Sequence, residues 1–135
     1  MKIKIFILLA IIGGILFFCF GNKKADNQKK VDNAVFSTAV ETAQKSIDFA
    51  KAKNSRDFVK LSHEYRKNRN GYYECYQLLQ NVTTPDNPKW NVREDLNNGT
   101  INVSCKLDKN RKLLIVLRHL PDKSMRFAYA CTLNA

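Results

Sequence analysis

Four blocks of different hydrophobic patterning follow one another along the chain. Residues 5–20 are apolar apart from two glycines, and residues 22–30 are polar and rich in lysine. Residues 31–80 carry apolar side chains at steps of three and four, which predicts amphipathic helices. Residues 89–135 alternate apolar and polar side chains, which predicts strands. The order predicts an N-terminal hydrophobic segment followed by an α+β domain.

The first block predicts contact with a membrane. It follows a basic start, and residues 3–20 approach the roughly 17–25 residues of a spanning helix. A basic start before an apolar core also fits a secretory signal, and Cys19-Phe20-Gly21 places small side chains where a cut ahead of Asn22 needs them. We therefore expect residues 1–21 to be a signal peptide or an N-terminal membrane anchor that enters the membrane at least transiently.

Two features of the sequence give opposite predictions for the side of the membrane on which the domain lies. Four lysines follow the apolar run, against Lys2, Lys4 and the terminal amine before it, and that balance would keep the C-terminal side of a retained helix in the cytoplasm. Three cysteines in the domain suit an oxidising compartment instead. We expect export to the bacterial cell envelope, either periplasmic or anchored to the inner membrane with the domain outside the cytoplasm. Cleavage of the leader stays open.

The helical half is expected at residues 31–80, after a polar basic tether at residues 22–30. A long stripe runs from Val31 to Ala50 and includes small residues that permit close packing. Asn54 with Asp57 three residues later predicts the N-terminus of a second helix. That helix is expected to run through Tyr65 and to end among the cations of residues 66–69, which favour a helix C-terminus. Residues 72–79 fit a short third helix better than a strand.

The second half, residues 89–135, predicts an antiparallel meander of four strands. Asn98-Gly99 is a strong hairpin signal between the first two strands. Residues 113–117 are continuously apolar, as expected for a strand that is placed centrally or covered on both faces. The last strand, residues 125–133, alternates again. The fold expected is α+β: two to three helices packed on one face of a four-stranded antiparallel β-meander, forming a single domain over residues 31–135.

The three cysteines of the domain are Cys75, Cys105 and Cys131. No C-x-x-C spacing exists, which excludes a zinc ribbon or a redox pair of that type. In a meander, the strands of Cys105 and Cys131 are separated by another strand, roughly 9–10 Å in all, which is too far for a disulfide. Both thiols are expected on the apolar face, so we favour a Cys75–Cys131 bond over Cys75–Cys105. In a reducing compartment all three would be ordinary core residues.

Charge indicates the kind of partner. The chain carries 23 Lys and Arg against 12 Asp and Glu, a net charge of +11, which suits an anionic partner or simply solubility. Basic and tyrosine side chains gather around the second helix and around a turn of the sheet. The predicted partner-binding residues are Arg56, Lys60, Arg66, Lys67, Arg69, Tyr72, Tyr73, Lys109, Arg111 and Lys112. Nucleic acid is less favoured than a protein or an anionic envelope component.

Catalysis finds little support in the residues. Cys75, His119 and Asp122 follow the chain order of cell-wall thiol amidases, but Glu74 beside the cysteine would raise the pKa of its thiol. There is no glycine-rich phosphate loop and no metal-ligand cluster in the sequence. We expect no catalytic residue, no metal and no cofactor, and we rank a thiol hydrolase as a distant alternative.

An apolar N-terminal helix, an amphipathic helix and a four-stranded meander, in that order, resemble type IV pilin-like proteins. The resemblance is architectural and implies a structural subunit of a filament. The chain departs from that family because residues 1–4 lack the leader glycine and no acidic residue precedes Asp26. The leading hypothesis is a non-enzymatic exported or membrane-tethered envelope protein that binds a protein or an anionic envelope partner, of the adaptor, inhibitor or immunity type.

Overall fold

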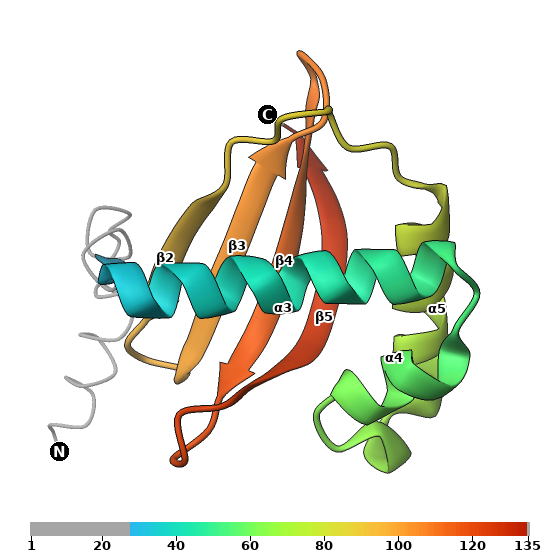
Figure 1. Cartoon of the computed structure of the whole chain (residues 1–135), viewed down its shortest axis with the longest axis horizontal. Helices are drawn as coiled ribbons and strands as arrows, with labels where there is room; N and C mark the ends of the chain where they lie inside the picture. The colour runs from blue at the N-terminus through green and yellow to red at the C-terminus, as the bar shows by residue number, and fades with distance from the viewer. Residues whose placement is uncertain (1–27, 135) are drawn as a thin grey trace, which may run out of the picture.

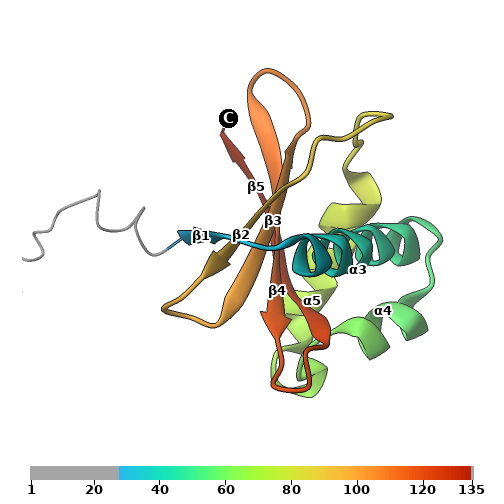
Figure 2. The ribbon, with the colours of Figure 1, turned by 60° about the vertical axis from the view of Figure 1, so that its left-hand side comes forward.

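The computed structural model describes residues 28–134 of the chain. Three helices pack on an antiparallel sheet, so the α+β fold is confirmed (Figure 1). Figure 2 shows all three helices on the same side of the sheet, with the opposite side bare of helices. The predicted hydrophobic leader lies outside the described residues. Between residues 28 and 134, no helix has the length and apolar character needed to cross a membrane.

The helical layer begins with α3 (Asn33–Lys51), which lies across the strands in Figure 1. It continues with α4 (Ser55–Leu61), a 3-10 helix η1 (Tyr65–Lys67) and α5 (Arg69–Asn81). The backbone N–H of Asp57 donates to Asn54 Oδ1 at 3.2 Å, so the predicted start of the second helix is confirmed. The helix predicted over residues 72–79 is also confirmed, as the larger part of α5.

The predicted end of the second helix is wrong. Helix α4 stops at Leu61, because Ser62 turns to extended backbone and pairs with Phe127 of the last strand. Glu64 then adopts a left-handed conformation with φ of 46°, which breaks the helical path. The cations of residues 66–69 therefore precede α5 instead of closing α4.

The sheet has five strands in chain order: β1 (Gln28–Lys30), β2 (Asn91–Asp95), β3 (Thr100–Lys106), β4 (Arg111–His119) and β5 (Met125–Asn134). The four-stranded meander predicted from the second half corresponds to β2–β5 and is confirmed. Strand β1 pairs with β2 and adds a fifth strand from residues that the sequence pattern assigned to the tether. Gly99, at φ of 67°, makes the predicted tight turn between β2 and β3.

The core lies between the helices and the inner face of the sheet. Ala39, Ala43 and Ala50 of α3 have no exposed surface, which allows that helix to approach the strands closely. Ile101, Leu113 and Phe127 come from three successive strands and are also fully covered. The small residues of the predicted long stripe thus serve the close packing expected of them.

The predicted inward alternation of the last strand is wrong beyond Phe127. The register between β4 and β5 shifts at Val116/Leu117: Leu117 pairs with Phe127, whereas Val116 pairs with Tyr129. Ala128 is the extra residue of a β-bulge. Because side chains alternate with a period of two, one inserted residue moves every later side chain to the other face. Tyr129, Cys131 and Leu133 consequently face away from the helices.

Candidate functional site

The predicted basic residues form two groups at opposite ends of the molecule. One group lies on α4, η1 and the start of α5, and comprises Arg56, Lys60, Arg66, Lys67 and Arg69. The other lies at the β3–β4 turn and comprises Lys109, Arg111 and Lys112. Both views place that turn far from α4 (Figures 1 and 2). The two groups therefore cannot belong to one compact site.

Some of these cations are engaged within the chain. Lys67 Nζ lies 3.3 Å from Glu64 Oε1, and Arg111 Nη2 lies 3.3 Å from Asp108 Oδ2. Asp108 also accepts hydrogen bonds from the backbone N–H groups of Asn110 and Arg111. These hydrogen bonds, chiefly that from Asn110, hold the pKa of the Asp108 carboxyl below its usual value. Arg111 is thus part of the turn's own structure.

The predicted tyrosines gather around a hollow of about 350 Å³ between α4 and α5. Tyr73 on its rim is 59% exposed, in keeping with a role in contacts. Tyr72 is only 5% exposed, and its hydroxyl donates to the carbonyl groups of His63 and Phe127. Burial raises the pKa of Tyr72. The prediction that Tyr72 contacts a partner is wrong, because the side chain is part of the core.

All three cysteines of the described chain are free thiols. Cys75 Sγ lies against the backbone of Ala130, 3.6 Å from its carbonyl oxygen and 3.4 Å from its amide nitrogen. The bulge turns the neighbouring Cys131 toward the opposite face, so the expectation that it shares the inner face with Cys105 is wrong. A Cys75–Cys131 bond would require β5 to turn over at residue 131, and the structure does not favour that pairing.

The structure does not bring together the residues of a thiol hydrolase. Burial, more than any other influence, raises the pKa of Cys75, which disfavours the nucleophilic thiolate. Cys75 contacts Ala130, which pairs with Ile115, and His119 is four residues further along β4, about 13 Å away along the strand. Asp122 lies beyond His119 and bonds to Ser124. In residues 28–134, no three His, Cys, Asp or Glu side chains cluster in a way that could hold a metal.

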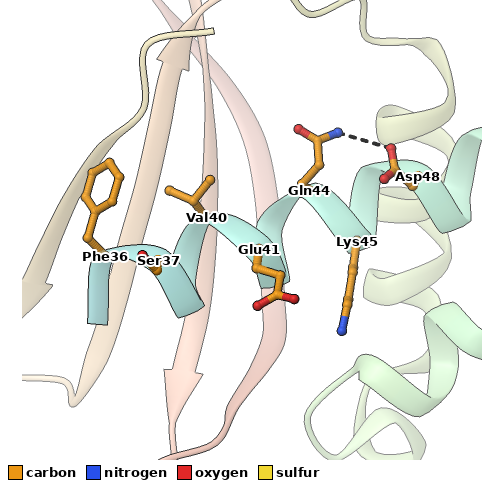
Figure 3. A pocket seen from close by; sticks show the side chains of 7 residues that line it. All are labelled: Phe36, Ser37, Val40, Glu41, Gln44, Lys45 and Asp48. Carbon is orange, nitrogen blue, oxygen red and sulfur yellow. Dashed lines mark hydrogen bonds between the residues drawn. The ribbon is translucent and has the colours of Figure 1, made fainter. Parts of the chain in front are cut away.

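A hollow of about 590 Å³ follows the outer surface of α3 (Figure 3). Its lining comes from that helix alone. Figure 3 shows Phe36, Val40 and Gln44 on one side of the helix and Glu41 with Lys45 on the other. Gln44 Nε2 donates to Asp48 Oδ1 at 3.1 Å. With no wall from a second element and with charges of both signs, this hollow lacks the convergent groups of a ligand site.

The sheet face turned away from the helices carries a more distinctive surface, which we call the open face. An apolar row from the two C-terminal strands runs along the β5 edge of this face: Leu114, Val116, Tyr129, Cys131 and Leu133. Tyr129 is 52% exposed and Leu133 is 40% exposed. Val116 pairs with Tyr129 and Leu114 with Cys131, so the row is contiguous across β4 and β5. No described helix covers it (Figure 2).

Cations flank the apolar row of the open face. Lys112 and Arg118 stand at the two ends of the row on β4, and Lys106 lies beside Lys112 on β3. Lys30 and Arg93 are on the same face but further across the sheet, on β1 and β2. Lys106 stands directly opposite Lys112, and Lys30 stands directly opposite Arg93. Asp95, two residues from Arg93 on β2, places a carboxylate on the same face. It accepts hydrogen bonds from the backbone N–H groups of Asn97 and Asn98 in the β2–β3 turn. The open face is therefore apolar along β4 and β5 and carries cations at the ends of that row and on β1 and β2.

Most residues of the open face were not predicted from the sequence to lie on a binding surface. Lys112 was among the predicted residues, but Tyr129, Cys131 and Leu133 were expected inside. One sequence feature could have indicated this face. In residues 111–118, every second residue from Lys112 to Arg118 gives a row with Leu114 and Val116 between two cations. The bulge itself left no signal in the pattern, because Ala128 is compatible with either face.

Comparison with known protein families, with curated proteins and with solved structures finds no match to this chain.

Proposed function

We propose that the protein is a non-enzymatic binding protein of the bacterial cell envelope, exported or membrane-tethered, of the adaptor, inhibitor or immunity type. Its partner is a protein or an anionic envelope component. The observation that carries this proposal is the open face, where a contiguous apolar row shares one side of the sheet with five cations. Uncovered apolar patches rimmed by polar residues are typical of interaction sites.

The chemistry of the described residues supports binding over catalysis. The thiol of Cys75 is buried against the Ala130 backbone, and its raised pKa keeps it in the unreactive form. His119 stands about 13 Å along β4 from the point that Cys75 contacts. A sheet that presents one face to helices and leaves the other free can bind a partner without moving its core.

The location is proposed from the N-terminal sequence. An apolar segment with a basic start directs a domain to or through the membrane. With the leader cleaved, the domain is periplasmic. With it retained, the domain is anchored at the inner membrane and faces the periplasm. Mass spectrometry of the native protein distinguishes these two states by its N-terminal residue.

Salt-dependent capture from an envelope extract tests the proposed function. Bound partner should fall steeply as NaCl rises from 0.05 to about 0.5 M, because the Debye length shrinks from roughly 14 Å to 4 Å over that range. Three results would contradict the proposal: no envelope component retained at any salt concentration, recovery of the protein in sheared surface filaments as a pilin-like subunit, or an enzymatic turnover that Cys75→Ala abolishes.

A further inference from the structure

We propose that the open face docks the acidic surface of a protein partner, with Tyr129 as the anchor residue. This inference rests on the proposed binding function and names the class of partner. It is carried by the cross-strand arrangement of charge on the face and by the position of Tyr129 within the apolar row.

The cations of the open face are paired against one another. Lys106 on β3 is the direct neighbour of Lys112 on β4, and Lys30 on β1 is the direct neighbour of Arg93 on β2. Like charges directly opposite one another destabilise a sheet. The repulsion within each pair decreases when anionic groups of a partner approach the open face. Two repelling pairs on one face therefore make it complementary to clustered carboxylates.

Tyr129 occupies the position of an anchor residue. It projects from the bulged strand, pairs with Val116 and is half exposed. Arg118 is two residues from Val116 on the same side of β4, so a cation lies next to the apolar row. An aromatic side chain among aliphatic groups, with cations beside them, has the composition of a protein-binding hot spot.

Other anionic partners fit this face less well. Single-stranded nucleic acid is held by stacking on several aromatic side chains, whereas Tyr129 is the aromatic residue of the apolar row. Binding to a lipid surface favours a large apolar face that penetrates the headgroup layer, whereas the row is short and has a cation at each end. A second copy of the chain would bring two positive faces together, which repel.

Photocrosslinking in whole cells tests the assignment. A benzophenone amino acid replaces Tyr129 in the full chain, and a matched chain carries it at Tyr73, an exposed tyrosine on α5. We expect residue 129 to yield a protein adduct whose crosslinked peptide is rich in Asp and Glu. The yield from residue 73 should be at least fivefold lower.

A charge variant separates docking from folding. Lys30→Glu with Lys106→Glu turns both like-charge pairs into opposite-charge pairs, so the sheet should be as stable as before or more so. The adduct at residue 129 should nevertheless fall at least tenfold. Lys45→Glu with Lys53→Glu makes the same change in net charge at exposed residues of the helical side and should leave the yield unchanged.

The outcomes that overturn the inference are distinct from those that overturn the proposed function. Adducts with lipid, nucleic acid or a second copy at residue 129, or a crosslinked peptide without excess acid, would refute the acidic protein partner. A protein adduct at residue 73 with none at residue 129 would move the binding site to the helices and leave the binding function standing. Absence of any adduct at both positions would refute both.

Discussion

Individual polar side chains of this molecule bond to backbone groups far away in the sequence. The Tyr72 hydroxyl bonds to carbonyl groups of residues 63 and 127, and Lys51 Nζ donates to the carbonyl groups of Gln80 and Val82 at the end of α5. A cation at that point also opposes the negative end of the α5 dipole. These contacts explain why a tyrosine that looked like a surface residue belongs to the core.

Replacing Tyr72 with Phe should lower the free energy of unfolding by about 1–2 kcal/mol, because two carbonyl groups lose a buried donor. Tyr73→Phe is the matched control on the same helix. Its hydroxyl accepts a bond from Gln77 at the surface, so the loss should stay within about 0.5 kcal/mol. Urea titrations followed by circular dichroism measure both. Equal effects of the two substitutions would show that Tyr72 is not anchored as described.

Local signals were reliable for the starts and turns of elements. Asn54 caps α4 and Asn98-Gly99 turns β2 into β3, because each motif acts through hydrogen bonds or backbone angles within a few residues. The end of α4 and the phase of β5 were not predictable in this way. Both depend on pairing with distant strands, through Ser62 with Phe127 and through the shift at Val116/Leu117.

The β5 bulge predicts an order of thiol reactivity. Cys131 is half-buried on the open face, whereas Cys75 and Cys105 are buried between the helices and the sheet. Iodoacetamide should therefore modify Cys131 first in the folded protein, and tenfold or more ahead of the other two. Burial raises the pKa of all three thiols, so the reaction should be slow near pH 7 and accelerate above pH 9.

Peptide mass spectrometry after short labelling times reads out this order. The same labelling in 8 M urea serves as the reference, because the three thiols should then react at similar rates. Protection of Cys131 equal to that of Cys75 would mean that β5 keeps a regular alternation and that the open face is composed differently.

The whole molecule should lose stability in alkali. Burial raises the pKa of Cys75 and Cys105 above the 9.0 of a free thiol and that of Tyr72 above 10.0. The unfolded chain then releases these protons at lower pH than the folded chain does. Their contribution to stability is complete below about pH 9 and is lost as the pH rises through the raised values.

Urea midpoints measured between pH 7 and pH 11 test this dependence, with Cys75→Ala as the comparison. The variant removes one of the groups and should show a shallower decline, whatever its stability at pH 7. An unchanged slope would indicate that the Cys75 thiol titrates normally. The pH dependence of stability is opposite for Asp108 and Asp122, because their pKa values are lowered from 3.8 in the folded chain. The stabilising contribution of these carboxylates therefore disappears as the pH falls below 3.8.

The amino-acid sequence by itself determined the class of fold, the presence and type of most elements, and the capping and hairpin residues. Those properties follow from hydrophobic period and from contacts among neighbours in the chain. Tertiary structure alone decided which side chains share a surface. One bulge residue, Ala128, sends Tyr129, Cys131 and Leu133 to the open face, and one pairing ends α4. Side-chain direction in a strand depends on register, and register is set between strands.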